Sequence, residues 1–213
     1  YGVAEMRFGL EGGAFGEWLP AAASAGLELP MADGPYTVLG QLRDRAGNVS
    51  ESFTATIALD TVAPHGSLVI DGGETYAADV SLDLSVTAHD DNELGEMRFG
   101  IQGGSFGDWV PVAGSAKLEI PRVDGPYTVM GQLRDRAGNL SPTFTDMITL
   151  DTAPPTSEVL PLVDVTVGLT ADVCWQGRDG TSGISAYEIE VRDGAHGSWT
   201  LWRSGTAASC ATF

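Results

Sequence analysis

Residues Gly40–Asn48 read GQLRDRAGN, and the same nine residues recur unchanged at Gly131–Asn139. The offset of 91 extends to both sides without a gap, and 33 of the 47 positions are identical when residues 4–50 are compared with residues 95–141. A fixed period of this kind indicates repeated structural units. We therefore interpret the first two copies as the product of a recent duplication.

A third, diverged copy follows residue 155. Residues 167–173 match residues 80–86 of the second copy, residues 186–191 match 96–101, and residues 197–199 match 107–109. The second copy is complete, whereas the first lacks its beginning and the third lacks its end. We expect the C-terminal part of a module over 1–64, a complete module over 65–155 and the N-terminal part of a diverged module over 156–213.

The chain of 213 residues corresponds to about 2.3 periods of 91. We expect it to belong to a longer polypeptide with further modules, and any targeting segment to lie upstream of Tyr1 or to have been removed. The alternative is that the incomplete halves complete one another between neighbouring copies. In that case Phe8 and Tyr36 of one copy would pack against Val173 and Trp175 of the next, which would propagate as a filament.

Apolar and polar residues alternate in short runs across residues 65–155. Side chains of a β-strand point to opposite faces in turn, so this period of two predicts strands with one buried face. Several such runs within about 90 residues, separated by Gly, Pro, Asp and Asn, predict an all-β sandwich of seven strands. Its expected core residues are Leu82, Leu84, Val86, Phe99, Leu118, Tyr127 and Leu133.

Two motifs carry a resemblance to a known class of module. Asp124–Tyr127 and Asp33–Tyr36 both read DGPY, which resembles the tyrosine corner of immunoglobulin-like and fibronectin type III-like sandwiches. The RDRAGN turn and the DTAPP segment at Asp151–Pro155 are similar to the turns and linkers of immunoglobulin-like repeats in large bacterial cell-surface proteins. The resemblance implies tandem immunoglobulin-like β-sandwich modules in a linear array, serving as a structural or adhesive stalk or filament outside the cell.

Charge and motifs restrict the partners and the chemistry. The chain has 29 acidic against 11 basic residues and a net charge of −18, which repels nucleic-acid phosphates and anionic lipids. We therefore expect that this segment binds no nucleic acid and does not insert into a membrane. The expected partners are neighbouring copies or modules in a fibre or surface layer, together with a cell-surface glycan or protein receptor. His65, His89 and His196 occupy non-equivalent positions without a Ser or Cys motif, so we expect no enzyme activity. His89 is expected at a strand end, exposed.

Acidic residues suggest one cofactor, calcium. In immunoglobulin-like sandwiches the B–C and F–G loops share one pole with the entering linker, which would gather Asp60, Asp90, Asp91, Asp135 and Asn139. Calcium prefers six to eight oxygen ligands, so these residues are candidate metal ligands. The alternative is that Asp135 and Asn139 stabilise a turn and that Asp60 caps one. At the second junction Arg178 is expected to replace the first acid of the Asp90–Asp91 pair, leaving Asp151 and Asp179 and weakening the case there.

Tryptophan also recurs. Trp18, Trp109 and Trp199 lie in a Gly-x-Trp frame, and Trp202 is an additional aromatic in the third copy. One interpretation makes these four residues glycan contacts of multivalent carbohydrate-binding modules, which is the alternative function. The other is that each Trp covers a sandwich edge, stacked on Arg7 or Arg98 in a cation–π contact.

Cys174 and Cys210 are the only cysteines, and each lies between residues expected to face inward. The immunoglobulin-like resemblance makes strands B and E neighbours, which implies a cross-strand disulfide between these two cysteines on the outer face. The alternative is two unpaired thiols. A disulfide fits the extracellular location that the resemblance implies.

Overall fold

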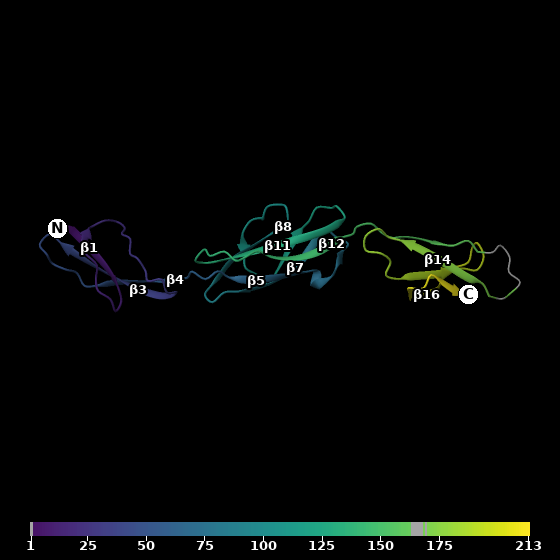
Figure 1. The fold of residues 1–213 in the computed structure, drawn as a ribbon, viewed down its shortest axis with the longest axis horizontal. Helices are drawn as coiled ribbons and strands as arrows, with labels where there is room; N and C mark the ends of the chain where they lie inside the picture. Colours follow the sequence, from purple (N-terminus) through teal and green to yellow (C-terminus); the bar gives the residue numbers. More distant parts are fainter. Residues whose placement is uncertain (1, 163–167, 169) are drawn as a thin grey trace.

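The computed structural model describes residues 2–162, 168 and 170–213. Tyr1 and part of the predicted match at residues 167–173 lie outside these residues. Three groups of strands follow one another along the long axis of the chain (Figure 1), and the described residues contain no α-helix, only a 3-10 turn, η1, at Asp71–Gly73. The predicted all-β fold is confirmed. No helix in the described part of the chain has the length and apolar character needed to cross a membrane.

The central group is a sandwich of two sheets. One sheet has the order β10-β7-β5 and the other β6-β12-β11-β8-β9. The strands are β5 His65–Ile70, β6 Tyr76–Ala77, β7 Ser81–His89, β8 Leu94–Ile101, β9 Val110–Pro111, β10 Ser115–Glu119, β11 Gly125–Asp135 and β12 Phe144–Leu150. There are eight strands instead of the expected seven, because the two-residue strand β6 adds a parallel pairing to β12. A strand this short has no visible period of two.

The core lies between the two sheets. Leu82, Leu84 and Leu133 are at most 1% exposed, so the inward positions that the period of two predicted are the buried ones. Val86 and Phe99 are also buried, whereas Leu118 and Tyr127 are half-buried and pack against the rim of the core. Tyr127 was predicted to be buried, but its hydroxyl must reach the backbone of an exposed loop, which keeps the ring at the edge.

The tyrosine corner is present in both copies. The hydroxyl of Tyr127 donates to the carbonyl oxygens of Pro121 at 3.0 Å and Val123 at 2.9 Å. In the first copy the hydroxyl of Tyr36 donates to the carbonyl oxygen of Ala32 at 2.6 Å. The resemblance of the DGPY motif to a tyrosine corner is therefore confirmed, and it fixes the start of the strand that ends in the repeated turn.

The glycine that opens the repeated GQLRDRAGN stretch has a packing role. A Cβ built on Gly131 would meet the ring of Phe144 at 2.2 Å, and one on Gly40 would meet the ring of Phe53 at 2.3 Å. Each pair lies directly across two adjacent strands. The aromatic ring thus covers the glycine backbone, and a larger residue at either position would displace it.

The first group is one sheet with the order β2-β1-β3-β4. Its strands are β1 Val3–Leu10, β2 Leu19–Pro20, β3 Gly34–Asp44 and β4 Phe53–Leu59, and it repeats the pairing of β9-β8-β11-β12. No second sheet of the described residues covers this one. Phe53 and Ile57 are accordingly 47% and 53% exposed. Their counterparts in the central sandwich, Phe144 and Ile148, are half-buried and buried.

The third group has a three-stranded sheet, β13-β14-β17, and a two-stranded sheet, β15-β16. Its strands are β13 Thr156–Val159, β14 Asp172–Arg178, β15 Tyr187–Val191, β16 Thr200–Thr206 and β17 Cys210–Thr212. Trp175 is its buried aromatic residue, 2% exposed. Its ring contacts those of Tyr187 and Trp202 edge to face.

The sequence match of the third copy is shifted by two residues in β14. Thr156, the counterpart of His65 after the linker, pairs with Arg178, whereas His65 pairs with His89. Trp175 therefore occupies the place of Val86, which the sequence had assigned to Val173. A shift of two keeps each side chain on the same face, so the alternation alone did not reveal it. In the same register Arg178 lies at the place of His89. The residue at the place of Asp90 is therefore Asp179, and the expectation that Arg178 replaces this acid was wrong.

Candidate functional site

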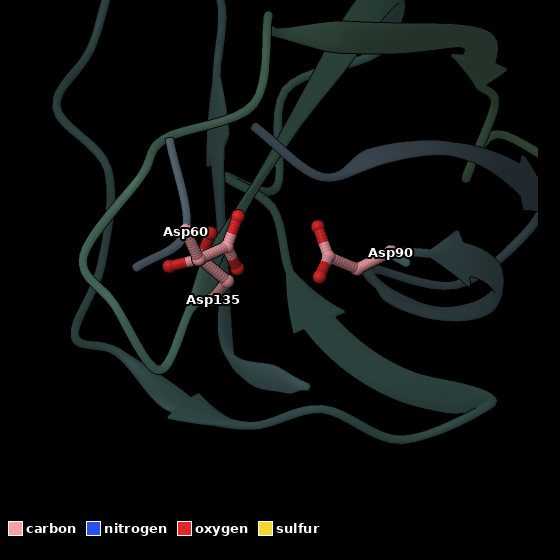
Figure 2. Close-up of side chains that lie close together, drawn as sticks. All are labelled: Asp60, Asp90 and Asp135. Carbon is pink, nitrogen blue, oxygen red and sulfur yellow. The ribbon is translucent and has the colours of Figure 1, made fainter. Parts of the chain in front are cut away.

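Three aspartates meet where the first linker enters the central sandwich. Asp60 follows β4, Asp90 follows β7 and Asp135 ends β11 (Figure 2), and one carboxylate oxygen of each lies within 4.8 Å of the others. Asp60 and Asp90 are half-buried, and Asp135 is 3% exposed. No salt bridge among the described residues involves any of the three. The site is therefore a partly desolvated group of like charges.

Asp135 forms the turn that follows its strand. One carboxylate oxygen accepts the backbone N–H groups of Gly138 at 2.6 Å and Asn139 at 2.8 Å, and the other accepts the Asn139 side-chain amide at 2.8 Å. That amide also donates to the carbonyl oxygen of Asp60 at 3.0 Å. Asn139 thus links the turn to the incoming linker. Its partner there is a backbone atom, so no sequence motif predicts the contact.

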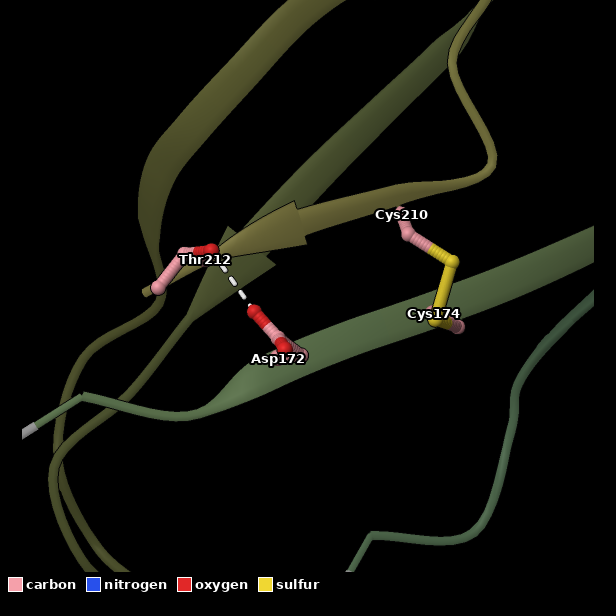
Figure 3. The surroundings of a disulfide bond; sticks show 4 residues. All are labelled: Asp172, Cys174, Cys210 and Thr212. Carbon is pink, nitrogen blue, oxygen red and sulfur yellow. Dashed lines mark hydrogen bonds between the residues drawn. A yellow bond between two sulfur atoms is a disulfide. The ribbon is translucent and has the colours of Figure 1, made fainter. Parts of the chain in front are cut away.

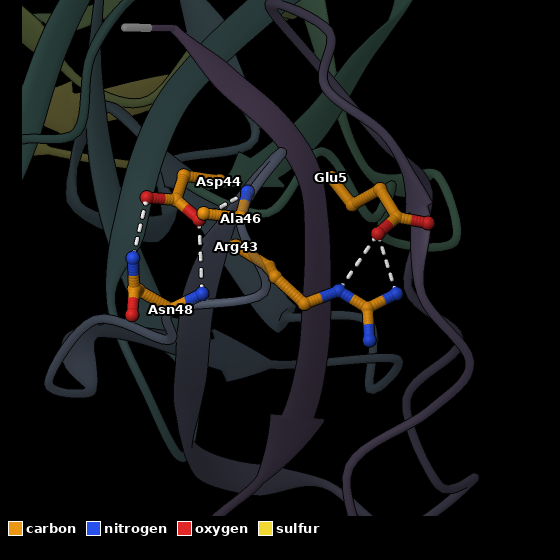
Figure 4. A network of polar contacts seen from close by, with 5 residues as sticks. All are labelled: Glu5, Arg43, Asp44, Ala46 and Asn48. Atoms are coloured by element: carbon orange, nitrogen blue, oxygen red, sulfur yellow. Dashed lines mark hydrogen bonds and ion pairs between the residues drawn. The ribbon is translucent and has the colours of Figure 1, made fainter.

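The first copy has the same turn, and in the described part of the chain its Asp44 belongs to no group of three potential metal ligands. Asp44 accepts the backbone N–H groups of Ala46 and Asn48 and the side-chain amide of Asn48, each at 2.9 Å (Figure 4). The hydrogen bond from the Asn48 side chain lowers the pKa of Asp44. Nearby, the Arg43 guanidinium pairs with Glu5 across the sheet. The RDRAGN segment therefore folds through local hydrogen bonds, as the turn interpretation predicted.

Asp90 is the member of the group that has an unsatisfied atom. Its Oδ1 accepts the backbone N–H of Asn92 at 2.9 Å, whereas its Oδ2 is buried and has no hydrogen-bond partner. A buried, unpaired carboxylate oxygen is costly unless a donor or a cation satisfies it. The carboxylate of Asp60 has a smaller desolvation cost, because its Oδ1 accepts the backbone N–H of Val62 at 3.1 Å and the residue is half-buried.

The structure brings together three of the five predicted metal ligands. Asp91 is exposed and lies outside the group. Asn139 is adjacent, but it directs N–H groups and not its amide oxygen at Asp60 and Asp135. The three carboxylates nevertheless fit a hard divalent cation such as Ca²⁺, since they provide oxygen ligands around a buried atom that lacks a partner.

The second junction satisfies its acids differently. Asp151 is 8% exposed, and its two oxygens accept the backbone N–H groups of Ala153 at 3.2 Å and Ser182 at 2.9 Å. The hydrogen bond from Ser182 lowers the pKa of Asp151. Asp179 accepts the backbone N–H groups of Thr181 at 3.0 Å and Gly183 at 2.7 Å. Both oxygens of Asp151 therefore have backbone donors, in contrast to Asp90 at the first junction.

The recurring tryptophans stack on arginines. The guanidinium carbons of Arg7 and Arg43 both lie 4.4 Å from the ring centre of Trp18. In the second copy Arg98 and Arg134 lie 4.3 and 4.6 Å from Trp109. Both tryptophans are half-buried. This arrangement favours the interpretation that each Trp covers a sandwich edge, because its ring already has cationic partners.

The two tryptophans of the third copy differ from each other. Trp202 packs edge to face against Trp175 and Phe213, so it belongs to the packing of that unit. Trp199 is 58% exposed, with Arg192 4.7 Å from its ring centre. Of the four predicted glycan contacts, Trp199 is the one that is exposed, although its ring, like those of Trp18 and Trp109, has a cationic partner.

Cys174 and Cys210 form a disulfide across β14 and β17 (Figure 3). The two cysteines are directly opposite each other in the strand register, at the places that Ser85 and Ser115 occupy in the central sandwich. Two residues along, Thr212 donates its hydroxyl to the carboxylate of Asp172 at 2.6 Å. The disulfide thus lies on the outer face of the sheet, where the fold resemblance and the alternation had placed it.

Similar chains are known among solved structures. One is a structure of fibronectin(III)-like modules of CbhA from Clostridium thermocellum, at 16% identity and a TM-score of 0.44, over 70% of this chain and 77% of that one. A tetra-tandem repeat in the extending region of a large adhesion protein is similar at 21% identity and a TM-score of 0.31, over 98% of this chain and 57% of that one.

A Ca²⁺-stabilized adhesin that helps an Antarctic bacterium bind ice is similar at 18% identity and a TM-score of 0.36, over 88% of this chain and 51% of that one. The chain thus spans little more than half of the two adhesin structures. No protein-family model matches the sequence, and no curated protein matches it either.

Proposed function

We propose that this chain is a non-catalytic segment of an extracellular stalk or filament on a bacterial surface. Its units are residues 1–64, 65–155 and 156–213, the second being a complete module. The observation that carries the proposal is the gap-free duplication of residues 4–50 at 95–141, which copies strands, turn and tyrosine corner together. Repetition of a whole unit adds length, and each unit contacts only its neighbours along the array.

Two further features support this role. The linkers Thr61–Pro64 and Thr152–Pro155 are short and contain proline, which favours semi-rigid connections between units. The disulfide between Cys174 and Cys210 is of the kind that persists in oxidising compartments outside the cytosol. The proposed partners are neighbouring modules or copies in a fibre or surface layer, together with a cell-surface receptor.

Small-angle X-ray scattering tests the stalk function. Arrays of two, four and six copies of residues 65–155 joined by the native linker should lengthen in proportion to the number of copies. Arrays joined by glycine-serine linkers of equal length are the control, and they should lengthen more slowly, as flexible chains do. Equal dimensions for the two series would contradict a stiff stalk.

We also propose calcium as the cofactor of the first junction, held by Asp60, Asp90 and Asp135. The supporting observation is the buried, unpartnered Oδ2 of Asp90 beside two further carboxylates. A bound cation would offset the repulsion within the group and fix the linker against the sandwich. Removal of calcium by a chelator should then lower the melting temperature of the chain, and added calcium should restore it.

A matched pair of variants separates the metal from the turn. Asp135→Ala should remove the calcium-dependent rise in melting temperature, whereas Asp44→Ala, at the same place in the first copy, should lower stability and leave that rise intact. If both variants lose equal stability with and without calcium, the aspartates serve only their turns. That result would leave the stalk function untouched, because the scattering experiment is independent of metal.

A further inference from the structure

Two histidines face one another on the outer surface of the central sandwich. His65 begins β5 and His89 ends β7, and the two are direct partners in the antiparallel register. Their ring centres are 4.9 Å apart, with 20° between the ring planes, and both side chains are exposed. His89 is thus exposed at a strand end, as expected, whereas no sequence motif placed His65 beside it.

The spacing of the rings suits a shared metal ion. An imidazole nitrogen binds Zn²⁺ at about 2.0–2.1 Å, which places each ring centre about 3.2 Å from the ion. Two such rings are then about 4.5 Å apart for a 90° angle at the metal and about 5.2 Å apart for a tetrahedral angle. The observed 4.9 Å lies between these values. Rotation about the Cβ–Cγ bonds, which is soft in histidine, would turn one nitrogen of each ring onto the ion.

The surroundings leave this rotation free. The next outward pair along the two strands is Ser67 and Thr87, whose short side chains leave room for the rings to turn. Among the described residues, no hydrogen bond or ion pair of either imidazole competes with a metal. The chain carries a net charge of −18, and Asp90 directly follows His89, so the local field favours a cation.

We propose that His65 and His89 form a binding site for a late first-row divalent transition metal, such as Zn²⁺, Ni²⁺ or Cu²⁺. Imidazole ligands prefer these ions, whereas carboxylates and waters suit calcium. The site is therefore distinct from the aspartate group, and it does not depend on calcium binding there. Water fills the remaining coordination positions, because both side chains are at the surface.

The described part of the chain contains this histidine pair once, since the third histidine, His196, lies far along the sequence. In the third unit the corresponding pair is Thr156 and Arg178, and neither residue type binds a transition metal in this way. The first unit has no counterpart among the described residues. A stoichiometry of one metal ion per chain is the direct consequence.

Calorimetric titration of the full chain with ZnCl₂, in the presence of excess calcium, tests the proposal. The excess calcium occupies any site for hard cations. One Zn²⁺ should bind per chain, and His65→Gln and His89→Gln should each weaken binding by about tenfold or more, because two linked ligands reinforce each other. His196→Gln is the matched control, since His196 is exposed on the third unit, and it should leave binding unchanged.

Two results would overturn the proposal. One is an unchanged affinity in both His65→Gln and His89→Gln. The other is loss of Zn²⁺ binding in Asp135→Asn while both histidine variants still bind. Melting temperatures without metal verify that the variants fold, since replacing an exposed side chain should change them little. A shift of the ligand-field absorption of bound Ni²⁺ in the histidine variants gives a second readout that does not depend on affinity.

Discussion

The side-chain amide of Asn139 donates a 3.0 Å hydrogen bond to the backbone carbonyl oxygen of Asp60, 79 residues earlier in the chain. The same amide donates to the carboxylate of Asp135. One residue therefore ties the turn of the central sandwich to the linker that enters it. Asn48, its counterpart in the first copy, makes the turn bond to Asp44.

This relationship predicts different costs for two equivalent substitutions. Asn139→Ala should lower the free energy of unfolding more than Asn48→Ala, by about 0.5–1.5 kcal/mol, the typical net value of one hydrogen bond. Denaturant unfolding of the full chain measures both. Equal losses would mean that the bond to the Asp60 carbonyl contributes nothing beyond the turn.

Asp90→Asn is expected to stabilise the chain when calcium is absent. The substitution keeps the shape of the side chain, removes one of three neighbouring negative charges and supplies an N–H donor beside the carboxylates of Asp60 and Asp135. It should also reduce the stabilisation that calcium gives. Melting curves with and without chelator measure both effects, and a destabilised Asp90→Asn in chelator would argue against a repulsive site.

The tyrosine corner should contribute measurably to stability. Tyr127→Phe removes the hydroxyl that donates to the carbonyl oxygens of Pro121 and Val123, and it should cost about 1–2 kcal/mol. Tyr76→Phe is the matched control, because Tyr76 is 46% exposed and should tolerate the change. Urea unfolding monitored by fluorescence measures both variants, and similar losses would remove any special role for Tyr127.

Reduction of the disulfide should destabilise the third unit and leave the central sandwich unaffected. The bond between Cys174 and Cys210 joins residues 36 apart, which corresponds to roughly 3 to 4 kcal/mol in the chain-entropy description. Hydrogen exchange with and without reductant resolves the units. Faster exchange in β7 and β11 on reduction would show that the disulfide acts beyond its own unit.

The second junction should lose stability at acidic pH. The hydrogen bond from Ser182 holds the pKa of Asp151 below its ordinary value, so the ionised form is favoured in the folded state. The contribution of Asp151 is therefore present above its ordinary pKa of about 3.9 and is lost as the pH falls through its lowered value. Asp151→Asn should reduce the loss of stability between neutral pH and pH of about 3, as measured by thermal unfolding at each pH.

Local patterns in the sequence were sufficient for the architecture of the complete unit. The period of two identified Leu82, Leu84 and Leu133 as core residues, because alternation along a strand is a property of the chain itself. The DGPY motif predicted the tyrosine corner for the same reason, since Tyr127 bonds to residues only four and six positions away. The repeat offset then transferred the tyrosine corner to Tyr36 of the first copy.

Contacts between distant segments required the tertiary structure. The two-residue shift in β14 preserves the alternation, so the sequence could not distinguish Val173 from Trp175 at the place of Val86. The unsatisfied oxygen of Asp90, the bond from Asn139 to the Asp60 carbonyl and the pairing of His65 with His89 depend on strand register and on backbone atoms. None of these three features has a residue-type signature, because any side chain leaves the backbone carbonyl in place and many registers satisfy the same pattern.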